Sequence, residues 1–513
     1  MTAHPSHRPL DDAAHAISEV VSSPEVYGLR QWSGWILGPA LLAATLVLPA
    51  PAGLSAEGWR TAGAGGLMAV LWITEAIPIP VTALLPLVLF PALHLSDIRE
   101  TAAPYANPII FLFLGGFLIA LAMQRWNLQR RVAITLIGAM GTRPRRIIAG
   151  FLTASTLISM WVSNTATAMM MLPIAASVVA LLPADAHRTP ALRGFGTALM
   201  LSVAYGATTG GMATLIGTPP NALLAAYVNS VYHVDIGFAQ WMLLGVPVTM
   251  VTLPCVHLLL TRVSFRLGHD EVPGMKELLA QERARLGRPR RGELAVAIVF
   301  LATAIGWVVQ PFVARVIPLV SDTTIAIAGA VALFLIPVNA RRGEFVMNWQ
   351  ATRGLPWEVL ILFGGGLSLA GNIERHGLSR YLGTLSSSLE GVPVIVTLCI
   401  VCFLILMLTE LTSNTATAAT FLPIVAATAV SLGQNPLLFL IPAALASNCS
   451  FMLPVGTPPN AIVFGSGLIT LPQMAKAGFI LNVVMVPVIV GLVLLLGPMV
   501  FDLQLNTLPA WVK

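Results

Sequence analysis

Charged residues are scarce in this sequence. Only 10% of its 513 residues are Asp, Glu, Lys or Arg, whereas 56% are hydrophobic, and the mean hydropathy is +0.83. A soluble domain needs about 25% charged residues to cover its surface. Apolar runs of roughly 20 residues, enough to cross about 30 Å of hydrocarbon, recur along the chain. The scarcity of charge therefore excludes a soluble globular protein and predicts an all-α, polytopic protein embedded in the lipid bilayer.

Cysteine is also scarce, and catalytic motifs are missing. The four cysteines lie in apolar segments and imply no disulfide framework; they are Cys255, Cys399, Cys402 and Cys449. The Cys-x-x-Cys spacing of 399–402 is compatible with redox or metal chemistry, but we interpret both residues as small apolar packing residues. No phosphate loop, His-Glu-x-x-His or Gly-x-Ser-x-Gly motif occurs. We therefore expect no enzyme activity and no organic cofactor.

The positive net charge does not indicate nucleic-acid binding. The net charge is +6, but basic residues of membrane proteins mark cytoplasmic loops. The first apolar run follows a polar tail of 30 residues that contains three His and four acidic residues, and no small-residue cleavage site follows it. We therefore do not interpret this run as a signal peptide.

The chain contains an internal duplication. Residues 163–175 align with residues 413–425 at a shift of 250, and nine of these thirteen positions are identical, beginning with Ser-Asn-Thr-Ala-Thr-Ala. A second motif, Gly-Thr-Pro-Pro-Asn-Ala, occurs at 217–222 and again at 456–461. The order of the motifs is kept while one loop shortens by eleven residues. The sequence therefore predicts two copies of one membrane unit.

The distribution of arginine predicts that the two copies are inverted. Segment 147–182 is too long for one straight span at about 1.5 Å per residue, and arginines flank it on both sides. Because basic flanks favour the cytoplasm, we expect an inner re-entrant hairpin with Ser163, Asn164 and Thr165 at its tip. The equivalent segment 392–432 has nearly uncharged flanks. It is expected to be a re-entrant hairpin that enters from the outside.

A complete topology follows from these two hairpins. We predict a cytoplasmic N-terminal tail (1–31), a first half (32–265), a cytoplasmic linker (266–293) and a second half (294–513). The eleven transmembrane helices are expected near 33–50, 60–78, 80–95, 107–124, 196–228, 239–265, 294–312, 322–340, 355–372, 436–465 and 476–500. With the N-terminus inside and the C-terminus outside, 22 of the 28 Lys and Arg residues lie on the cytoplasmic side.

Three further segments are expected at the membrane surface. Residues 125–141 are predicted to form an amphipathic interfacial helix, and 375–388 is its repeat partner. The basic stretch 275–291 belongs to the linker between the halves. It has two interpretations, binding of anionic lipid or a plain solvated loop, and the sequence favours the loop.

The duplicated motifs predict a polar site inside the membrane. Ser-Asn-Thr at a hairpin tip leaves backbone groups without helical partners, which a membrane tolerates only inside protein or at a polar cavity. In Gly-Thr-Pro-Pro-Asn, two prolines remove amide donors and interrupt the helix. Discontinuous helices point positive N-terminal ends at anions, and their unwound carbonyls coordinate Na⁺. Two tips and two breaks related by inversion are expected to meet near the midplane, although small polar residues also serve plain helix packing.

No Lys or Arg occurs in these motifs. Hydroxyls, amides and helix ends bind anions more weakly than a guanidinium group does, so a dianion held by them needs other neutralising charge. Oxygen-rich groups suit a hard cation such as Na⁺. Glu410, whose repeat partner is Met160, leaves two interpretations open: a functional intramembrane carboxylate, or a residue that braces the hairpin.

Together these features resemble the divalent-anion/sodium symporter family, the INDY-like dicarboxylate transporters. The resemblance rests on the paired Ser-Asn-Thr and Gly-Thr-Pro-Pro-Asn motifs and on Trp-Ile-Thr-Glu-Ala-Ile-Pro-Ile-Pro at 72–80, and it covers nearly the whole chain after residue 32. It implies eleven spans plus two re-entrant hairpins, a homodimer and an elevator mechanism. Spans one to four and seven to nine are implied to form a scaffold against which the remaining elements move.

The resemblance also implies three sets of site residues. The first Na⁺ site is implied to use Ser159, Ser163, Asn164 and the Gly217 carbonyl, and the second to use Thr409, Thr412, Asn414 and the Gly456 carbonyl. Relatives often have a small apolar residue at the position of Thr412, but the implied contact there is a backbone carbonyl. The substrate carboxylates are implied to contact Ser163, Asn164, Thr165, Thr218, Ser413, Asn414, Thr415, Thr457 and Pro458.

The implied function is Na⁺-coupled import of C4-dicarboxylates of the succinate, malate and fumarate class. The protein is expected in the inner (plasma) membrane. Two alternatives stay open on the same motifs: Na⁺-independent dicarboxylate exchange, and transport of sulfate or tricarboxylates. A channel is a further alternative, which would conduct far faster than a carrier.

Overall fold

The computed structural model describes residues 27–182, 190–268, 270–385 and 391–512, and in these residues the chain is almost wholly helical. Its sheet consists of one short antiparallel pair, β1 (Pro337–Asn339) and β2 (Glu344–Phe345). Most of the predicted N-terminal tail, up to residue 26, lies outside the described residues. So do residues 386–388 of the second predicted surface helix and the C-terminal residue Lys513.

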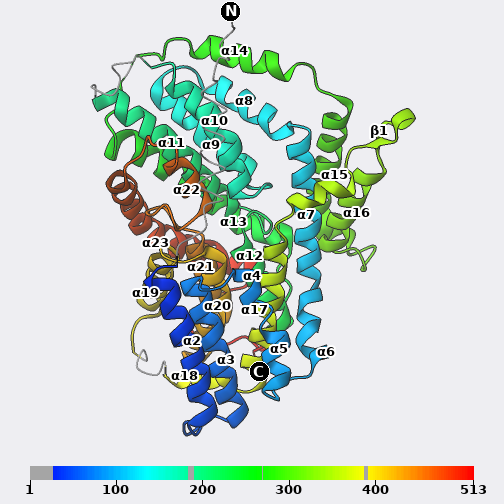
Figure 1. The fold of residues 1–513 in the computed structure, drawn as a ribbon, viewed down its shortest axis with the longest axis vertical. Helices are drawn as coiled ribbons and strands as arrows, with labels where there is room; N and C mark the ends of the chain where they lie inside the picture. Colours follow the sequence, from blue (N-terminus) through cyan, green and yellow to red (C-terminus); the bar gives the residue numbers. More distant parts are fainter. Residues whose placement is uncertain (1–26, 183–189, 269, 386–390, 513) are drawn as a thin grey trace, which may run out of the picture.

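The described residues of the first half form twelve α-helices and two short irregular turns (Figure 1). In chain order they are α2 (Leu29–Val47), α3 (Ala56–Thr74), α4 (Ile79–Thr82), α5 (Pro86–Ala92), α6 (Ile98–Ala102), the 3₁₀ turn η1 (Ala103–Ala106), α7 (Pro108–Arg125), α8 (Leu128–Met140), α9 (Pro144–Ser159), α10 (Asn164–Val179), α11 (Pro190–Gly211), α12 (Pro219–Tyr232) and α13 (Phe238–Leu258), which continues as the π-helical turn η3 (Leu259–Val263).

The second half follows helix α14 (Met275–Leu286). Its elements are α15 (Arg291–Val313), α16 (Asp322–Leu335), β1, the 3₁₀ turn η4 (Ala340–Arg342), β2, the 3₁₀ turn η5 (Trp349–Gly354), α17 (Trp357–Arg375), α18 (Leu378–Leu385), α19 (Val394–Thr409), α20 (Asn414–Ser431), α21 (Pro436–Ser447), α22 (Pro458–Phe464) and α23 (Leu471–Phe501).

Both duplicated motifs interrupt helices where the sequence predicts. Ser163 and Ser413 are the N-caps of α10 and α20, so each Ser-Asn-Thr begins a new helix after a short break. Thr218 and Thr457 are the N-caps of α12 and α22, and the two prolines that follow occupy the first helical positions. Proline is tolerated there because the first amides of a helix have no intrahelical acceptor. The backbone angles of the two threonines are nearly equal, at φ −141°, ψ 148° and φ −144°, ψ 148°.

The packing of the interrupted helices is crosswise between the halves. Helix α12, which begins at the first Pro-Pro, packs against α20, which begins at the second Ser-Asn-Thr. Helix α22 packs in the same way against α10 and α11. The break of each half therefore lies against the Ser-Asn-Thr helix of the other half.

Three predicted segments differ in the structure. The predicted span 80–95 consists of two short helices, α4 and α5. The predicted span 322–340 ends as a helix at Leu335, because the strand β1 of the short β-hairpin begins at Pro337. The linker is not a plain loop, since α14 occupies residues 275–286 and packs against α8.

Five of the described helices are long and apolar enough to cross a membrane by length and composition. They are Ile98–Arg125, Phe238–Val263, Arg291–Val313, Asn414–Ser431 and Leu471–Phe501. Five other apolar helical segments of the described residues are shorter, at 10–17 residues, and two of them, α10 and α19, flank a Ser-Asn-Thr tip. The two predicted surface helices, α8 and α18, lie toward opposite ends of the molecule (Figure 1).

Candidate functional site

The first Ser-Asn-Thr tip contacts the first helix break directly. The Ser159 hydroxyl donates to Asn164 Oδ1 at 2.6 Å. A Cβ atom at Gly211 would lie 2.7 Å from Asn164 Oδ1 and would overlap with the Thr218 methyl group. Gly211 is therefore required for the close approach of Asn164 and Thr218. The tip itself begins with Ser163, whose hydroxyl caps α10 by accepting from the Ala166 amide at 3.3 Å.

The loop of the first break is closed by Asn221. Its side-chain amide donates to the carbonyls of Gly211 at 3.2 Å and Thr214 at 2.8 Å. A Cβ atom at Gly217 would overlap with the Gly211 carbonyl. The chain thus folds back on itself, and residues 211 and 217 lie side by side next to Asn164. This arrangement brings three of the four residues implied for the first Na⁺ site into one neighbourhood.

The second tip repeats the geometry of the first with threonine in place of serine. The Thr409 hydroxyl lies 2.7 Å from Asn414 Oδ1 and 2.9 Å from the Ser447 carbonyl, which ends α21. The hydroxyl of Thr412 lies 2.6 Å from that of Thr417 and donates to the Leu408 carbonyl. The side chain of Thr412 is therefore occupied within the helix pair, as expected if only its carbonyl serves the site.

The second break is closed by Asn460, the counterpart of Asn221. Asn460 donates to the carbonyls of Ser450 at 3.1 Å and Leu453 at 3.0 Å. A Cβ atom at Gly456 would overlap with the Ser450 hydroxyl and lie 3.2 Å from the Glu410 carbonyl oxygen. At Gly217 the overlap is with the backbone of Gly211, whereas at Gly456 it is mainly with the side chain of Ser450.

Two buried asparagines join the breaks of the two halves. Asn448 donates to the side-chain oxygen of Asn221 at 2.9 Å, and both side chains are fully buried. This bond joins the two breaks, Thr409 joins the second tip to the carbonyl of Ser447, and the first tip lies against Gly211. We refer to the two breaks and the two tips together as the polar network. The sequence interpretation missed Asn448. Its only signal was the polar run 447–450, which interrupts an otherwise apolar segment.

Two hydroxyl groups in this network have no partner. Thr218 and Thr457 are 2% and 4% exposed, and their Oγ1 atoms make no hydrogen bond within the described residues. A buried polar atom without a partner costs about 1–3 kcal/mol. The Ser-Asn-Thr tips beside them are only half-buried, and Pro458 is exposed. The neighbourhood therefore combines half-buried polar tips with buried hydroxyls that lack a partner in the described residues.

Glu410 braces the second break. Its carboxylate accepts from three consecutive backbone amides: Phe451 at 2.7 Å, Met452 at 2.9 Å and Leu453 at 3.1 Å. It also accepts from Asn482 at 2.6 Å and from the Ser450 hydroxyl at 3.2 Å. Glu410 is 3% exposed. The bracing interpretation of Glu410 is thus the one that these contacts support, and Asn482, on α23, is a second residue that the sequence interpretation missed.

The ion pairs found in the described residues lie away from the network. They are Arg30–Glu75, Arg130–Glu282, Arg131–Glu293, Arg285–Glu282 and Arg375–Glu100. The oxygen atoms of the tips and breaks come from hydroxyls, amides and backbone carbonyls, with Glu410 turned toward the backbone of its own break. Such groups are suited to an alkali cation and to an anion that brings its own counter-ions.

A cavity of about 570 Å³ reaches the second tip. It is lined by Ser413 and Thr415 on one side and by the segment from Glu75 to Pro80 on the other, with Glu358 and Leu362 from α17. Its volume lies in the range of small-molecule sites, about 300–1,000 Å³. Two predicted substrate-binding residues therefore line an accessible space.

A family model described as the transmembrane region of sodium:sulfate symporters matches residues 29–503. The chain belongs to the sodium:sulfate symporter family. This is the divalent-anion/sodium symporter family that the paired motifs predict, so that prediction is confirmed. The match extends from α2 to just beyond α23 and includes both tips and both breaks.

Members of this symporter family resemble the chain over most of its length. The sodium-dependent dicarboxylate transporter SdcS of Staphylococcus saprophyticus is 42% identical over 487 residues, which is 94% of each chain. The protein of the same name from Staphylococcus aureus is 42% identical over 488 residues, again 94% of each chain.

Two solved structures resemble the symporter fold described here. The YdaH transporter of Alcanivorax borkumensis is 13% identical, with a TM-score of 0.53, and the match covers 93% of this chain and 99% of that chain. MtrF of Neisseria gonorrhoeae is 12% identical, with a TM-score of 0.56 and coverage of 97% and 98%. At such low identity the likeness concerns the fold alone. It confirms a mostly helical, polytopic transporter fold.

Proposed function

We propose that this chain imports C4-dicarboxylates of the succinate, malate and fumarate class together with Na⁺. The observation that supports this function best is the polar network itself. Two half-buried Ser-Asn-Thr tips lie with two buried, unpartnered threonine hydroxyls, and the motifs contain no basic side chain. The SdcS proteins, which are named sodium-dependent dicarboxylate transporters and share 42% identity, support the same substrate class.

The carboxylates of the substrate are proposed to bind at the beginnings of the interrupted helices. Helices α10, α12 and α20 begin at Ser163, Thr218 and Ser413 as N-caps. The first amides of a helix attract negative charge, and serine or threonine hydroxyls add donors there. We assign substrate contacts to Ser163, Asn164, Thr165, Thr218, Ser413, Asn414, Thr415, Thr457 and Pro458. The free hydroxyls of Thr218 and Thr457 are then satisfied by the bound dianion.

Two Na⁺ ions are proposed to neutralise this dianion. The first is assigned to Ser159, Ser163, Asn164 and the Gly217 carbonyl, and the second to Thr409, Thr412, Asn414 and the Gly456 carbonyl. The Asn side-chain oxygens are held by Ser159 and Thr409, respectively, at 2.6 and 2.7 Å. Each hydroxyl therefore fixes the orientation of the Asn oxygen at its own proposed Na⁺ site. Neutral oxygen donors of this kind suit Na⁺, and no organic cofactor is needed.

The fold is proposed to work as an elevator of two inverted halves. The halves comprise residues 32–265 and 294–513, with eleven transmembrane helices and two re-entrant hairpins, 147–182 and 392–432. The position of α8 and α18 toward opposite ends of the molecule supports inversion (Figure 1). A homodimer in the inner (plasma) membrane, with the N-terminus inside and the C-terminus outside, completes the proposal. In this arrangement the crosswise packing of α12 on α20 lets both tips and both breaks move as one body.

Proteoliposomes test the coupling. Purified protein is reconstituted, and uptake of labelled succinate is followed with an inward Na⁺ gradient or with K⁺ in its place. We expect accumulation only with the Na⁺ gradient, and competition by malate and fumarate but not by sulfate. Uptake that does not depend on the Na⁺ gradient but increases when the vesicles are preloaded with dicarboxylate would instead identify a Na⁺-independent exchanger.

The stoichiometry is measured by the current that accompanies transport. Two Na⁺ ions with one dianion carry no net charge, so we expect uptake to be insensitive to membrane potential. A third Na⁺ would add about 2.3 kcal/mol of driving force per 100 mV. Uptake that increases with an inside-negative potential would therefore contradict a site with only two cations.

A further inference from the structure

A second cavity lies where α7 meets the surface helix α8. Its volume is about 220 Å³, and it is lined by Arg125, Trp126, Asn127, Arg131, Arg285, Leu286, Arg290 and Glu293. These residues come from the corner between α7 and α8, from the end of α14 and from the start of α15. Helices α8 and α14 lie together at one end of the molecule (Figure 1). This cavity is separate from the polar network described above.

Two of the four arginines that line this cavity are already neutralised. Arg131 makes a two-pronged ion pair with Glu293 and also donates to the Gly287 carbonyl. Arg285 pairs with Glu282 at 2.7 Å. The Arg131 contacts hold the start of α15 and the end of the linker helix against α8, and Arg130 of α8 pairs with Glu282 of α14 at 2.6 Å. The walls of the cavity are therefore built by protein contacts and do not depend on a ligand.

The other two arginines have no partner in the described part of the chain. The guanidinium groups of Arg125 and Arg290 take part in none of its hydrogen bonds or ion pairs. Arg125 ends α7, and Arg290 is the residue before α15. Both side chains are exposed. The carboxylate on the cavity wall, Glu293, is already paired with Arg131. Among the described residues, the charges of Arg125 and Arg290, on two different elements, thus face one small cavity without a carboxylate of their own.

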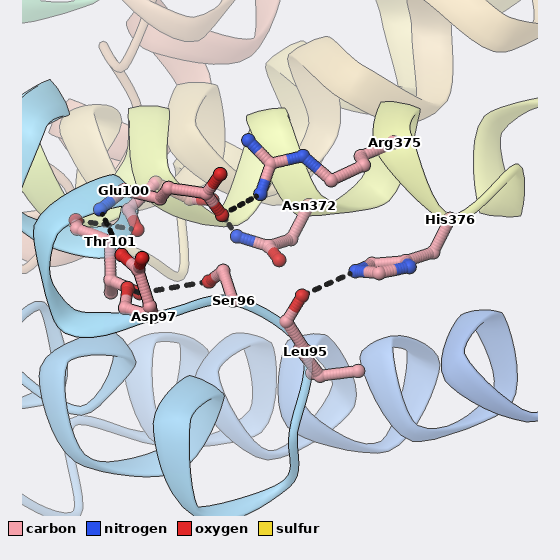
Figure 2. Close-up of polar contacts among 9 residues, drawn as sticks. Leu95, Ser96, Asp97, Glu100, Thr101, Asn372, Arg375 and His376 are labelled. Atoms are coloured by element: carbon pink, nitrogen blue, oxygen red, sulfur yellow. Dashed lines mark hydrogen bonds and ion pairs between the residues drawn. The ribbon is translucent and has the colours of Figure 1, made fainter.

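In the equivalent corner of the second half, between α17 and α18, the arginine is paired with a carboxylate. Arg375 is the repeat partner of Arg125, and its guanidinium pairs with Glu100 at 2.7 Å (Figure 2). His376 beside it contacts the Leu95 carbonyl at 3.0 Å. The two corners have the same backbone turn, since Asn127 and its partner Gly377 both have positive φ, 56° and 71°. The arginine before this turn is therefore paired with a carboxylate in the second half, and it has no such partner among the described residues in the first half.

The open corner borders an apolar surface of α15. Leu294, Ile298 and Leu301 are each more than half exposed and recur at helical spacing directly after Glu293. An exposed apolar stripe on a membrane helix is suited to contact with lipid acyl chains. In the proposed topology this corner lies on the cytoplasmic side, where anionic headgroups attract basic residues. A phosphate in the cavity would have its acyl chains beside this stripe.

We propose that this cavity binds the phosphate of an anionic phospholipid headgroup, with Arg125 and Arg290 as its charge partners. Trp126 forms a fixed wall of this cavity, because its indole N–H donates to the Val346 carbonyl at 2.9 Å and its ring packs on Gly292. The linker, in which α14 replaces the expected plain loop, contributes Arg290 to this proposed site. The bound lipid joins the corner between α7 and α8 to the linker that connects the two halves.

Binding of short-chain lipids to the purified full-length protein tests this site. The probes are dioctanoyl phosphatidylglycerol, dioctanoyl phosphatidylcholine and inorganic phosphate, each titrated while the dissociation constant and the melting temperature are measured. We expect phosphatidylglycerol to bind and stabilise the protein, and the other two probes to have little effect. Stabilisation by inorganic phosphate at the same concentrations would contradict a lipid site, as would equal binding of phosphatidylcholine.

The variant Arg125→Gln/Arg290→Gln removes the two unpaired charges. Arg288→Gln/Arg291→Gln is the matched control, because it removes the same charge from exposed linker residues that do not line the cavity. We expect phosphatidylglycerol to bind the first variant about tenfold more weakly than the control, given the attraction of each basic residue to anionic lipid. Equal affinities of the two variants would overturn the proposal. The single variant Arg290→Gln, with a severalfold loss, provides the same test if the double variant has a lower melting temperature without lipid.

Discussion

The two helix breaks share one sequence motif but are stabilised by different chemistry. In the second break, the carboxylate of Glu410 accepts from the amides of Phe451, Met452 and Leu453. In the first break, the position of Glu410 is occupied by Met160, which contributes only a backbone carbonyl to the Thr214 hydroxyl at 2.6 Å. A charged brace therefore connects the tip and the loop in the second half, and a neutral hydrogen bond does so in the first.

Local backbone geometry explains this difference. In the first break, the amides of Met212 and Ala213 donate to carbonyls three residues earlier, at 3.3 and 3.0 Å. Two amides of the first break are therefore satisfied by neighbouring backbone, without a side-chain acceptor. The three successive amides of the second break point at Glu410, and buried amides without acceptors are costly. Duplication has thus preserved the shape of the site while allowing two solutions for its support.

The largest effect is expected where the two halves are alike, at the Asn residue of each tip. Replacing either Asn164 or Asn414 by Ala removes the side-chain oxygen that Ser159 or Thr409 orients. We expect both variants to lose succinate uptake to the level of empty vesicles, while melting temperature and elution volume stay close to those of the wild type. Full activity in both variants would remove the assignment of the site to the Ser-Asn-Thr tips.

The variant Glu410→Gln should distinguish the support of the second break from that of the first. A glutamine places an NH₂ group among backbone donors, so at least one buried amide loses its acceptor, at about 1–3 kcal/mol each. We expect uptake to fall by about tenfold or more and the melting temperature to decrease. The matched control, Met160→Leu, keeps the carbonyl that Thr214 uses and should retain most activity. Similar losses in the two variants would show that Glu410 has no special bracing role.

A smaller effect is expected at position 211 and its counterpart 450. Gly211→Ala places a methyl group against Thr218 and Asn164, so the first tip must shift, and we expect uptake to decrease severalfold to about tenfold. Ser450→Ala removes one 3.2 Å hydrogen bond to Glu410, worth about 1 kcal/mol. Uptake by Ser450→Ala should stay within about threefold of the wild type. A larger loss in Ser450→Ala than in Gly211→Ala would reverse the comparison.

Most of the helix pattern, including the four points at which helices are interrupted, could be predicted from the sequence, because proline, glycine and Ser-Asn-Thr act locally on the backbone. The breaks before α10, α12, α20 and α22 follow directly from these residues. The sites that resemblance implies stay predictions, since the coordination of Na⁺ and substrate is a matter of bound ions. The linker helix α14 was not predicted, because it is held by an ion pair with α8, Arg130–Glu282, whose partners lie far apart in sequence.

The supporting residues were harder to predict than the motifs. Asn448 and Asn482 lie in apolar segments, and neither belongs to a repeated pattern. Their partners, Asn221 and Glu410, lie 227 and 72 residues away in the sequence. Only the folded chain brings such pairs together. A single polar residue in an apolar span identifies a candidate for a buried hydrogen bond, but its partner depends on tertiary packing.

The smallest effect is expected from the aromatic residues that support the two loops from outside. Tyr205 donates to the Phe451 carbonyl at 2.9 Å, and Trp241 donates to the equivalent carbonyl of Met212 at 3.1 Å. Tyr205→Phe leaves one buried carbonyl of the second break with its donor removed, so we expect a loss of about 1–2 kcal/mol in stability. The half-buried Tyr381, whose hydroxyl has no hydrogen bond within the described residues, supplies the control Tyr381→Phe. Thermal unfolding should show a lower melting temperature for Tyr205→Phe but not for Tyr381→Phe. Uptake by both variants should be nearly unchanged, because Glu410 still holds the loop. A loss of uptake in Tyr205→Phe as large as in Glu410→Gln would mean that the carboxylate is not the dominant support.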